Sequence, residues 1–150
     1  MGYNPPTSGA LSSIEEQLQR MVLELRILES YYNELTARET LIARAVLDSK
    51  ATIEALKSIP TDSDSEILVP LGAGVLMRVC SPTVDKLLLN IGAGVVIEKS
   101  KEDTLKYLNE RVSQLEAALS NISAQKAELA NKINAYRAQV NSLAAKLEQG

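Results

Sequence analysis

Two similar stretches in the middle of the chain decide its fold: Ile67–Val79, ILVPLGAGVLMRV, and Lys86–Lys99, KLLLNIGAGVVIEK. In each, apolar residues alternate with other residues on both sides of a Gly-Ala-Gly triplet, and the second triplet follows the first by twenty residues. Alternation with a period of two is typical of half-buried strands, and a short link containing glycine is typical of hairpin loops. The sequence therefore predicts two β-hairpins within residues 66–99.

The loop length determines which residues share a face of each hairpin. A three-residue Gly-Ala-Gly loop would set Leu71 opposite Val75 and Ile91 opposite Val95. Each hairpin then has one apolar face that needs cover, and the residues on these faces are Ile67, Val69, Leu71, Val75, Met77, Val79, Leu87, Leu89, Ile91, Val95 and Ile97. Strands of other subunits could cover them in an intersubunit β-barrel, which also pairs the free strand edges. A private four-stranded sheet packed on the chain's own helix ends is the alternative.

Long heptad repeats flank the hairpins and predict one helix over residues 13–59 and another over residues 100–148. Apolar residues recur every three or four positions, interrupted only by Glu39 and Ser49 in the first repeat and by Lys126 in the second. Repeats of this length are typical of coiled coils. The fold class is therefore α+β, with a long two-helix coiled coil joined by two hairpins.

The ends of the two predicted helices carry recognisable capping residues. Ser12 and Ser13 each precede a glutamate by three residues, and Ser100 precedes Asp103 in the same way, as in capping boxes. Residues 1–12 contain proline and glycine and are expected to be mobile.

The helices have similar lengths and are joined through the hairpins, so we expect them to pair antiparallel. Aligning their ends places Leu11–Leu18 beside Leu147–Val140. Glu39 and Lys126 are then expected to approach each other, and charges within a seam usually fix helix alignment.

Composition excludes several classes of function. The 150 residues include no Phe, Trp or His, five Tyr and one cysteine, Cys80, and the net charge is −3 with both signs interspersed. Nucleic-acid binding needs clustered basic residues. A membrane span needs about 20 apolar residues. Neither pattern is present. The single cysteine allows no internal disulfide and is typical of a reducing cytoplasm.

The Gly-Ala-Gly triplets do not predict a nucleotide site. A GxGxxG loop needs a third glycine and a helix directly after it, whereas a strand is expected here. Glycine at positive φ in a hairpin turn is the better interpretation. Without histidine or a Cys/His cluster we expect no enzyme activity, metal or cofactor.

The two hairpins with their flanking helices resemble the alpha-class subunit of the prefoldin family, and most of all its archaeal members. The specific strings are Leu68–Gly72 (LVPLG) and Ile91–Lys99 (IGAGVVIEK), flanked by long helices, within residues 13–148. The resemblance implies an ATP-independent chaperone in which alpha-class subunits join beta-class subunits into a hexamer through barrels made from hairpins. A beta-class subunit would carry one hairpin, and this chain has two.

The resemblance also implies which partners the chain binds and where. Non-native polypeptides would be held at the free helix ends and passed to a group II chaperonin, with no role for nucleic acid or membrane. The implied client-binding residues are Leu11, Ile14, Leu18, Met21, Val22, Leu23, Tyr136, Val140, Leu143 and Leu147.

Two other functions share the same sequence features. Some alpha-like family members are expected to assemble with themselves into filaments, since contacts that do not close give open-ended assemblies. A coiled-coil scaffold without client activity would also use the helices, but it gives no reason for apolar residues at their ends.

Overall fold

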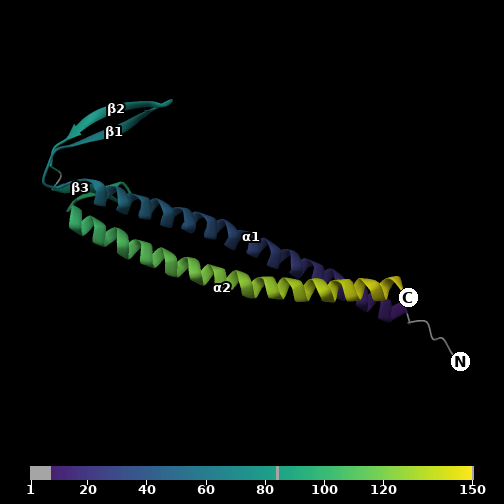
Figure 1. The fold of residues 1–150 in the computed structure, drawn as a ribbon. Coiled ribbons are helices and arrows are strands. Elements are labelled where there is room, and N and C mark those ends of the chain that lie inside the picture. Colours follow the sequence, from purple (N-terminus) through teal and green to yellow (C-terminus); the bar gives the residue numbers. More distant parts are fainter. Residues whose placement is uncertain (1–7, 84, 150) are drawn as a thin grey trace. The chain divides into compact units, whose positions relative to one another are not determined.

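The computed structural model describes residues 8–83 and 85–149 and contains two long helices separated by four strands (Figure 1). The elements are α1 Ser8–Ser58, β1 Ser65–Gly72, β2 Val75–Ser81, β3 Lys86–Gly92, β4 Val95–Ser100 and α2 Lys101–Glu148. The chain divides into two units. We call residues 8–42 with 118–149 the terminal unit, and Ala43–Ala117 the hairpin unit. The predicted α+β architecture of two helices joined by two hairpins is confirmed.

The first helix starts earlier than the sequence pattern suggested. α1 begins at Ser8, so the prediction of a helix that starts at 13 is wrong for residues 8–12, whereas residues 1–7 lie outside the described part of the chain. Leu11 stands seven residues before Leu18, so the heptad repeat continues for another turn upstream. The two serines predicted as caps consequently lie inside the helix.

The start of α2 is fixed by side-chain hydrogen bonds. Asp103 N–H donates to Ser100 Oγ at 3.0 Å, which confirms Ser100 as the cap. The hydroxyl of Thr104, which is buried, donates to the Ser100 carbonyl at 2.8 Å. Lys101 Nζ donates to the Ile59 carbonyl. In the hairpin unit, the end of α1 and the start of α2 are thus tied to each other.

Each unit buries a short section of the helical seam. The buried aliphatic residues are Val46, Ile53, Leu108 and Val112 in the hairpin unit and Leu35, Leu129 and Ile133 in the terminal unit. All of them occupy predicted heptad positions. Burying one such side chain contributes about 1.5–3 kcal/mol relative to leaving it exposed. The helices are therefore held by apolar contacts within the chain.

The four strands form two separate two-stranded antiparallel sheets, β1–β2 and β3–β4. Within the described residues, no private four-stranded sheet forms. Val69 pairs with Met77 and Leu89 pairs with Ile97, as the alternation predicted.

The loop of the first hairpin is shorter than expected. Gly72, not Leu71, pairs with Val75, and the register shifts between positions 70 and 72. Ala73 and Gly74 form a two-residue turn with φ of 51° and 79°. A type I′ turn needs positive φ at both central residues, and it matches the twist of the strands. Leu71 is the additional residue at the resulting bulge.

The second hairpin repeats this turn twenty residues later. Gly92, not Ile91, pairs with Val95, and Ala93 has a φ of 52°. One contact is particular to this copy: Gly92 N–H donates to Asn90 Oδ1 at 2.9 Å. Position 70 of the first hairpin holds Pro70 in place of this asparagine.

Candidate interaction surfaces

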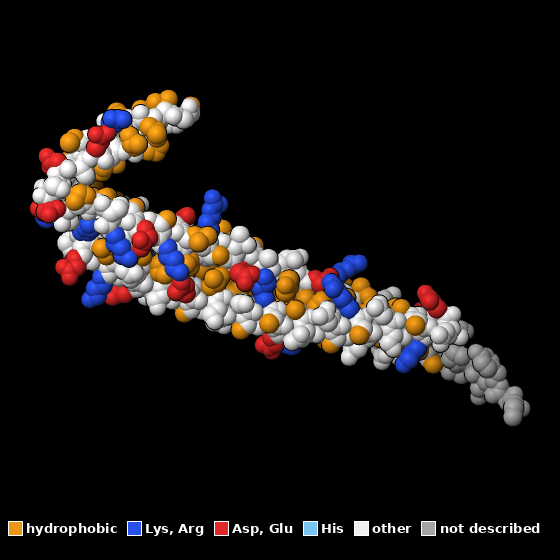
Figure 2. Space-filling model, in the orientation of Figure 1, with side chains coloured by type: hydrophobic (Ala, Val, Ile, Leu, Met, Phe, Trp, Pro, Cys, Tyr) orange, Lys and Arg blue, Asp and Glu red, His pale blue; other side chains and the backbone are white. Residues whose placement is uncertain are grey.

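The predicted apolar face of the hairpins is only partly covered. We call it the first face; it contains the eleven residues expected to mediate assembly. Residues of this face far from the turns are half-buried, namely Ile67, Val79, Leu87, Leu89 and Ile97. Those nearer the turns are exposed, namely Val69, Leu71, Val75, Met77, Ile91 and Val95. Figure 2 shows hydrophobic side chains gathered on the β1–β2 hairpin.

The reverse side of each hairpin, which we call the opposite face, also exposes aliphatic side chains. Leu68 and Leu76 lie there on the first hairpin, and Leu88 and Val96 lie at the corresponding positions of the second. Leu88 is 77% exposed, the highest value among the exposed large hydrophobic residues that the structure describes. These four residues were not among those expected to mediate assembly, although their spacing of twenty repeats that of the glycine triplets.

A charged pair accompanies the aliphatic residues of each opposite face. In the first hairpin Arg78 Nε lies 3.3 Å from Glu66 Oε1. In the second, Lys86 Nζ lies 3.5 Å from Glu98 Oε2. All four side chains are exposed. Each pair joins neighbouring strands diagonally.

Strand edges are the second uncovered feature of the hairpins. Because each sheet has only two strands, each strand keeps one edge without a strand neighbour within the described residues. Such edges present unpaired backbone N–H and C=O groups and readily accept another strand. Apolar faces and free edges together suit the hairpins for assembly.

Most of the predicted client-binding residues are half-buried. This holds for Leu11, Ile14, Leu18, Met21, Val22, Tyr136, Val140, Leu143 and Leu147. None of them is as well covered as Leu35, which is 2% exposed. Leu23 and Ile27 of α1 are 63% and 61% exposed. Both residues lie within the range Leu11–Ile27 that the resemblance implies as client surface.

Ion pairs set the register of the helices in the terminal unit. Lys126 Nζ donates to Glu39 Oε2 at 2.5 Å, so the predicted approach of these residues is confirmed. Arg137 donates from both Nε and Nη2 to Glu29 Oε1, at 3.2 and 2.6 Å. Leu18 stands eleven residues before Glu29, and residue 148 stands eleven residues after Arg137. Leu18 is therefore level with Leu147 and its neighbour.

The expected alignment of the helix ends was therefore wrong by one heptad. It placed Leu18 beside Val140, whereas the ion pairs place it level with Leu147. A seven-residue repeat presents the same apolar pattern after a shift of seven, so it cannot distinguish the two alignments. The charged residues in and beside the seam make the distinction.

The surroundings of Lys126 explain why a cation is tolerated in the seam. Its side chain is 16% exposed and its ammonium lies 5.1 Å from the centroid of the Tyr32 ring. The hydrogen bond to Glu39 raises the pKa of Lys126, although desolvation opposes this effect. A similar hydrogen bond to Glu24 raises the pKa of Tyr136. Both contacts favour the protonated side chain.

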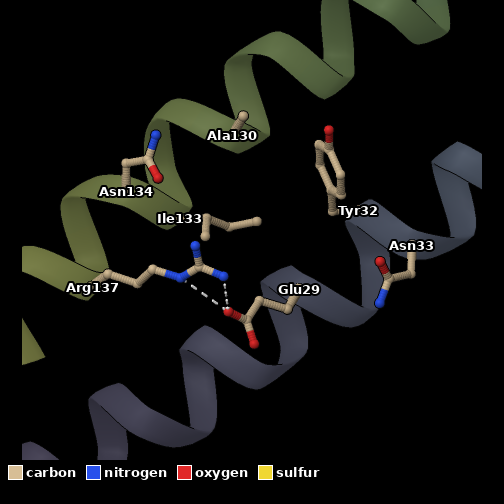
Figure 3. A pocket seen from close by; sticks show the side chains of 7 residues that line it. All are labelled: Glu29, Tyr32, Asn33, Ala130, Ile133, Asn134 and Arg137. Carbon is tan, nitrogen blue, oxygen red and sulfur yellow. Dashed lines mark hydrogen bonds and ion pairs between the residues drawn. The ribbon is translucent and has the colours of Figure 1, made fainter.

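A groove of about 510 Å³ lies beside the ion pair of Glu29 and Arg137 (Figure 3). It is lined by Glu29, Tyr32, Asn33, Ala130, Ile133, Asn134 and Arg137. Figure 3 shows the Arg137 guanidinium reaching from α2 to Glu29 on α1. Within the described ranges, no group of three or more His, Cys, Asp or Glu residues could hold a metal ion. The groove offers amide and ion-pair chemistry rather than a metal centre.

Neither of the described helices is both long enough and apolar enough to cross a bilayer.

Comparisons with known proteins identify the architecture. The family model described as "Prefoldin subunit" matches residues 28–146. The prefoldin subunit alpha of Nitrosopumilus maritimus is 33% identical over 135 residues, which cover 90% of this chain and 93% of that protein. The prefoldin subunit alpha of Methanoregula boonei is 36% identical over 104 residues, 69% of this chain and 63% of that protein.

A solved structure shares the fold. The crystal structure of the prefoldin beta subunit from Thermococcus strain KS-1 matches with a TM-score of 0.58 and 17% identity, covering 95% of this chain and 96% of that one. At that identity the likeness concerns the fold alone. The family match and the identity with an alpha subunit over most of both chains show that this chain belongs to the prefoldin family, as an alpha-class subunit.

Proposed function

We propose that the chain is a subunit of an ATP-independent cytoplasmic chaperone. In this proposal it assembles with beta-class prefoldin subunits through the hairpins, holds non-native polypeptides at the free helix ends and passes them to a group II chaperonin. The observation that carries the proposal is the presence of exposed apolar side chains in two places, on the hairpins and at Leu23 and Ile27 in the first half of α1.

The hairpins support the assembly part of the proposal. Their first faces leave six apolar residues exposed, and within the described residues each strand keeps one edge without a strand neighbour. Closing the strands of several subunits into a barrel would cover the first faces and pair the edges at once. The opposite faces would then lie on the outside of that barrel.

The start of α1 supports the client-binding part. Leu23 and Ile27 are four residues apart, so they lie on one face of the helix and form a small exposed aliphatic patch. Met21 nearby is half-buried and flexible, which suits contact with varied sequences. One such patch binds weakly, but several arms around one polypeptide raise avidity by about 10²–10⁴. Weak single contacts also permit release without nucleotide hydrolysis.

Aggregation of a chemically denatured client protein, followed by light scattering, tests the proposal. The variant Leu23→Ser/Ile27→Ser should need several-fold more chain for the same suppression. The control Leu41→Ser/Leu47→Ser removes two leucines of α1 that are each 68% exposed but lie farther along the helix. Both variants replace exposed residues, so they should disturb the helical seam less than substitutions at Val22 or Leu143, which are half-buried.

The two variants must first be shown to assemble with a beta-class subunit as the wild type does. Equal suppression by both variants and the wild type would contradict client binding at the start of α1. An equal loss in both would mean that exposed leucines act anywhere along the helix.

A further inference from the structure

The charged pairs of the two opposite faces have reversed signs. Position 66 is glutamate and its counterpart twenty residues later is Lys86; position 78 is arginine and its counterpart is Glu98. The aliphatic positions of the same faces keep their character across the repeat. In the first hairpin the acidic residue is therefore on the first strand, and in the second hairpin it is on the second strand.

The ion pairs show how far these side chains reach. Leu68 is the direct partner of Arg78 across the ladder, so the contact of Arg78 with Glu66 runs along a diagonal. Lys86 and Glu98 meet on the corresponding diagonal of the other hairpin. Adjacent strands in any sheet are about 4.8 Å apart. A strand added at either edge would therefore offer the same diagonal contact.

Consider a hairpin from another copy of the chain, added at a strand edge with its turn pointing the same way. The β2 edge then lies antiparallel to a β1 edge, and the β4 edge lies antiparallel to a β3 edge. Between two copies of the first hairpin, Arg78 meets Glu66 of a second copy. Between two copies of the second hairpin, Glu98 meets Lys86 of a second copy. Both contacts join opposite charges.

Unlike hairpins give the reverse result in this arrangement. If β2 lies beside β3, Arg78 meets Lys86; if β4 lies beside β1, Glu98 meets Glu66. Both contacts join like charges, which destabilise neighbouring strands. Repulsion of a wrong partner is a common source of specificity.

We propose that like hairpins of two copies of this chain pair side by side, β2 beside β1 and β4 beside β3, and that the reversed charges keep unlike hairpins apart. The inference rests on the proposed function, because it assumes assembly through hairpin edges. In this arrangement the exposed aliphatic pairs, Leu68 with Leu76 and Leu88 with Val96, continue as one stripe across the joined hairpins.

Each contact has a modest effect because the charged side chains are exposed. Changing a contact from opposite to like charge should weaken association by roughly two- to fivefold. The effect multiplies over the contacts of an assembly and decreases at high salt, where exposed charges are screened. Because β2 meets β1 rather than another β2, the contact is heterologous and either closes into a ring or continues into a filament.

Charge reversal in the full chain tests the pairing. Arg78→Glu and Glu66→Arg should each assemble more weakly than the wild type in sedimentation velocity at about 0.1 M salt. An equimolar mixture of the two variants should recover wild-type assembly, since alternating copies again join acidic to basic side chains at every contact. Within each hairpin both variants keep a like-charge pair, so an effect confined to the hairpin predicts no recovery.

The double variant Glu66→Arg/Arg78→Glu should assemble with itself as the wild type does. The corresponding pair in the second hairpin, Lys86→Glu and Glu98→Lys, should show the same recovery on mixing. Single variants that assemble normally, a mixture that does not recover, or a wild-type chain that stays monomeric would each overturn the pairing.

Client assays keep the two proposals distinguishable. If mixing fails to restore assembly while the wild type suppresses client aggregation, only the pairing inference is wrong. If the wild type fails to suppress aggregation in the presence of a beta-class subunit, the chaperone proposal is wrong even when mixing restores assembly.

Discussion

The helical seam and the hairpins use apolar residues in opposite ways. The seam buries leucine, isoleucine and valine between two segments of the same chain, as at Leu35 and Ile133. The hairpins carry aliphatic residues on both faces and leave most of them exposed. Burial is therefore a source of stability for the helices within one chain. The hairpins depend on turn geometry within the chain and, in our proposal, on other subunits for cover.

The largest expected effect separates these two uses. Leu35→Ala removes a side chain that is fully buried, and we expect a loss of about 2–5 kcal/mol in the free energy of unfolding, from lost burial and the remaining cavity. Leu76→Ala is the matched hairpin control, because Leu76 is exposed. It should change the free energy of the isolated chain by less than about 0.5 kcal/mol. Urea denaturation followed by circular dichroism measures both. Equal losses would contradict the comparison.

A smaller effect than that of Leu35→Ala is expected for the turn of the first hairpin. Gly74 has a φ of 79°, and an added Cβ would meet no atom within 4 Å. Gly74→Ala should therefore cost about 1–2 kcal/mol through backbone conformation alone. Amide hydrogen exchange along β2 should become faster by the factor that corresponds to this loss of free energy. Ala73→Gly is the control: it relieves an alanine at positive φ, so exchange should not become faster. Unchanged exchange in Gly74→Ala would show that the turn does not hold the hairpin.

The sequence predicted the seam well because burial follows directly from periodicity. Every buried aliphatic residue of the described helices stands at a predicted heptad position. The alignment of the helices was less accessible, since a heptad repeat matches itself after a shift of seven. The approach of Glu39 and Lys126 could be predicted because a charge in a seam has few possible partners.

The hairpins were predicted as elements but not in detail. Alternation identified the strands, while the turn was expected to contain three residues because both glycines were assigned to it. Ala73 and Ala93 adopt positive φ, which alanine rarely does, so residue type gave no signal of the two-residue turn. The exposed aliphatic residues of the opposite faces were harder to predict, because Leu68 and Leu88 stand among charged residues such as Glu66 and Glu98. The hypothesis that these surfaces mediate assembly stays a prediction.

The smallest expected effect is a dependence on pH that belongs to the seam and has no counterpart in the hairpins. The hydrogen bond to Glu39 raises the pKa of Lys126 above its ordinary value of 10.5, and Glu24 raises the pKa of Tyr136 above 10.0. A group whose pKa is higher in the folded chain contributes stability that is fully present below its unfolded pKa. This stability is lost as pH rises through the folded pKa. The contribution should therefore be constant near neutral pH and decrease above about pH 10.

Melting temperatures measured between pH 8 and about pH 12 test this dependence. Glu39→Gln removes the carboxylate that stabilises the Lys126 cation, so the variant should melt lower near neutral pH and show a smaller decrease at high pH. Glu24→Gln should act in the same way through Tyr136. Glu66→Gln is the hairpin control: its partner Arg78 is exposed, so the melting temperature should change little and by the same amount at every pH. If all three variants kept the wild-type pH profile, the contacts of Glu39 with Lys126 and of Glu24 with Tyr136 would not contribute to the stability of the seam.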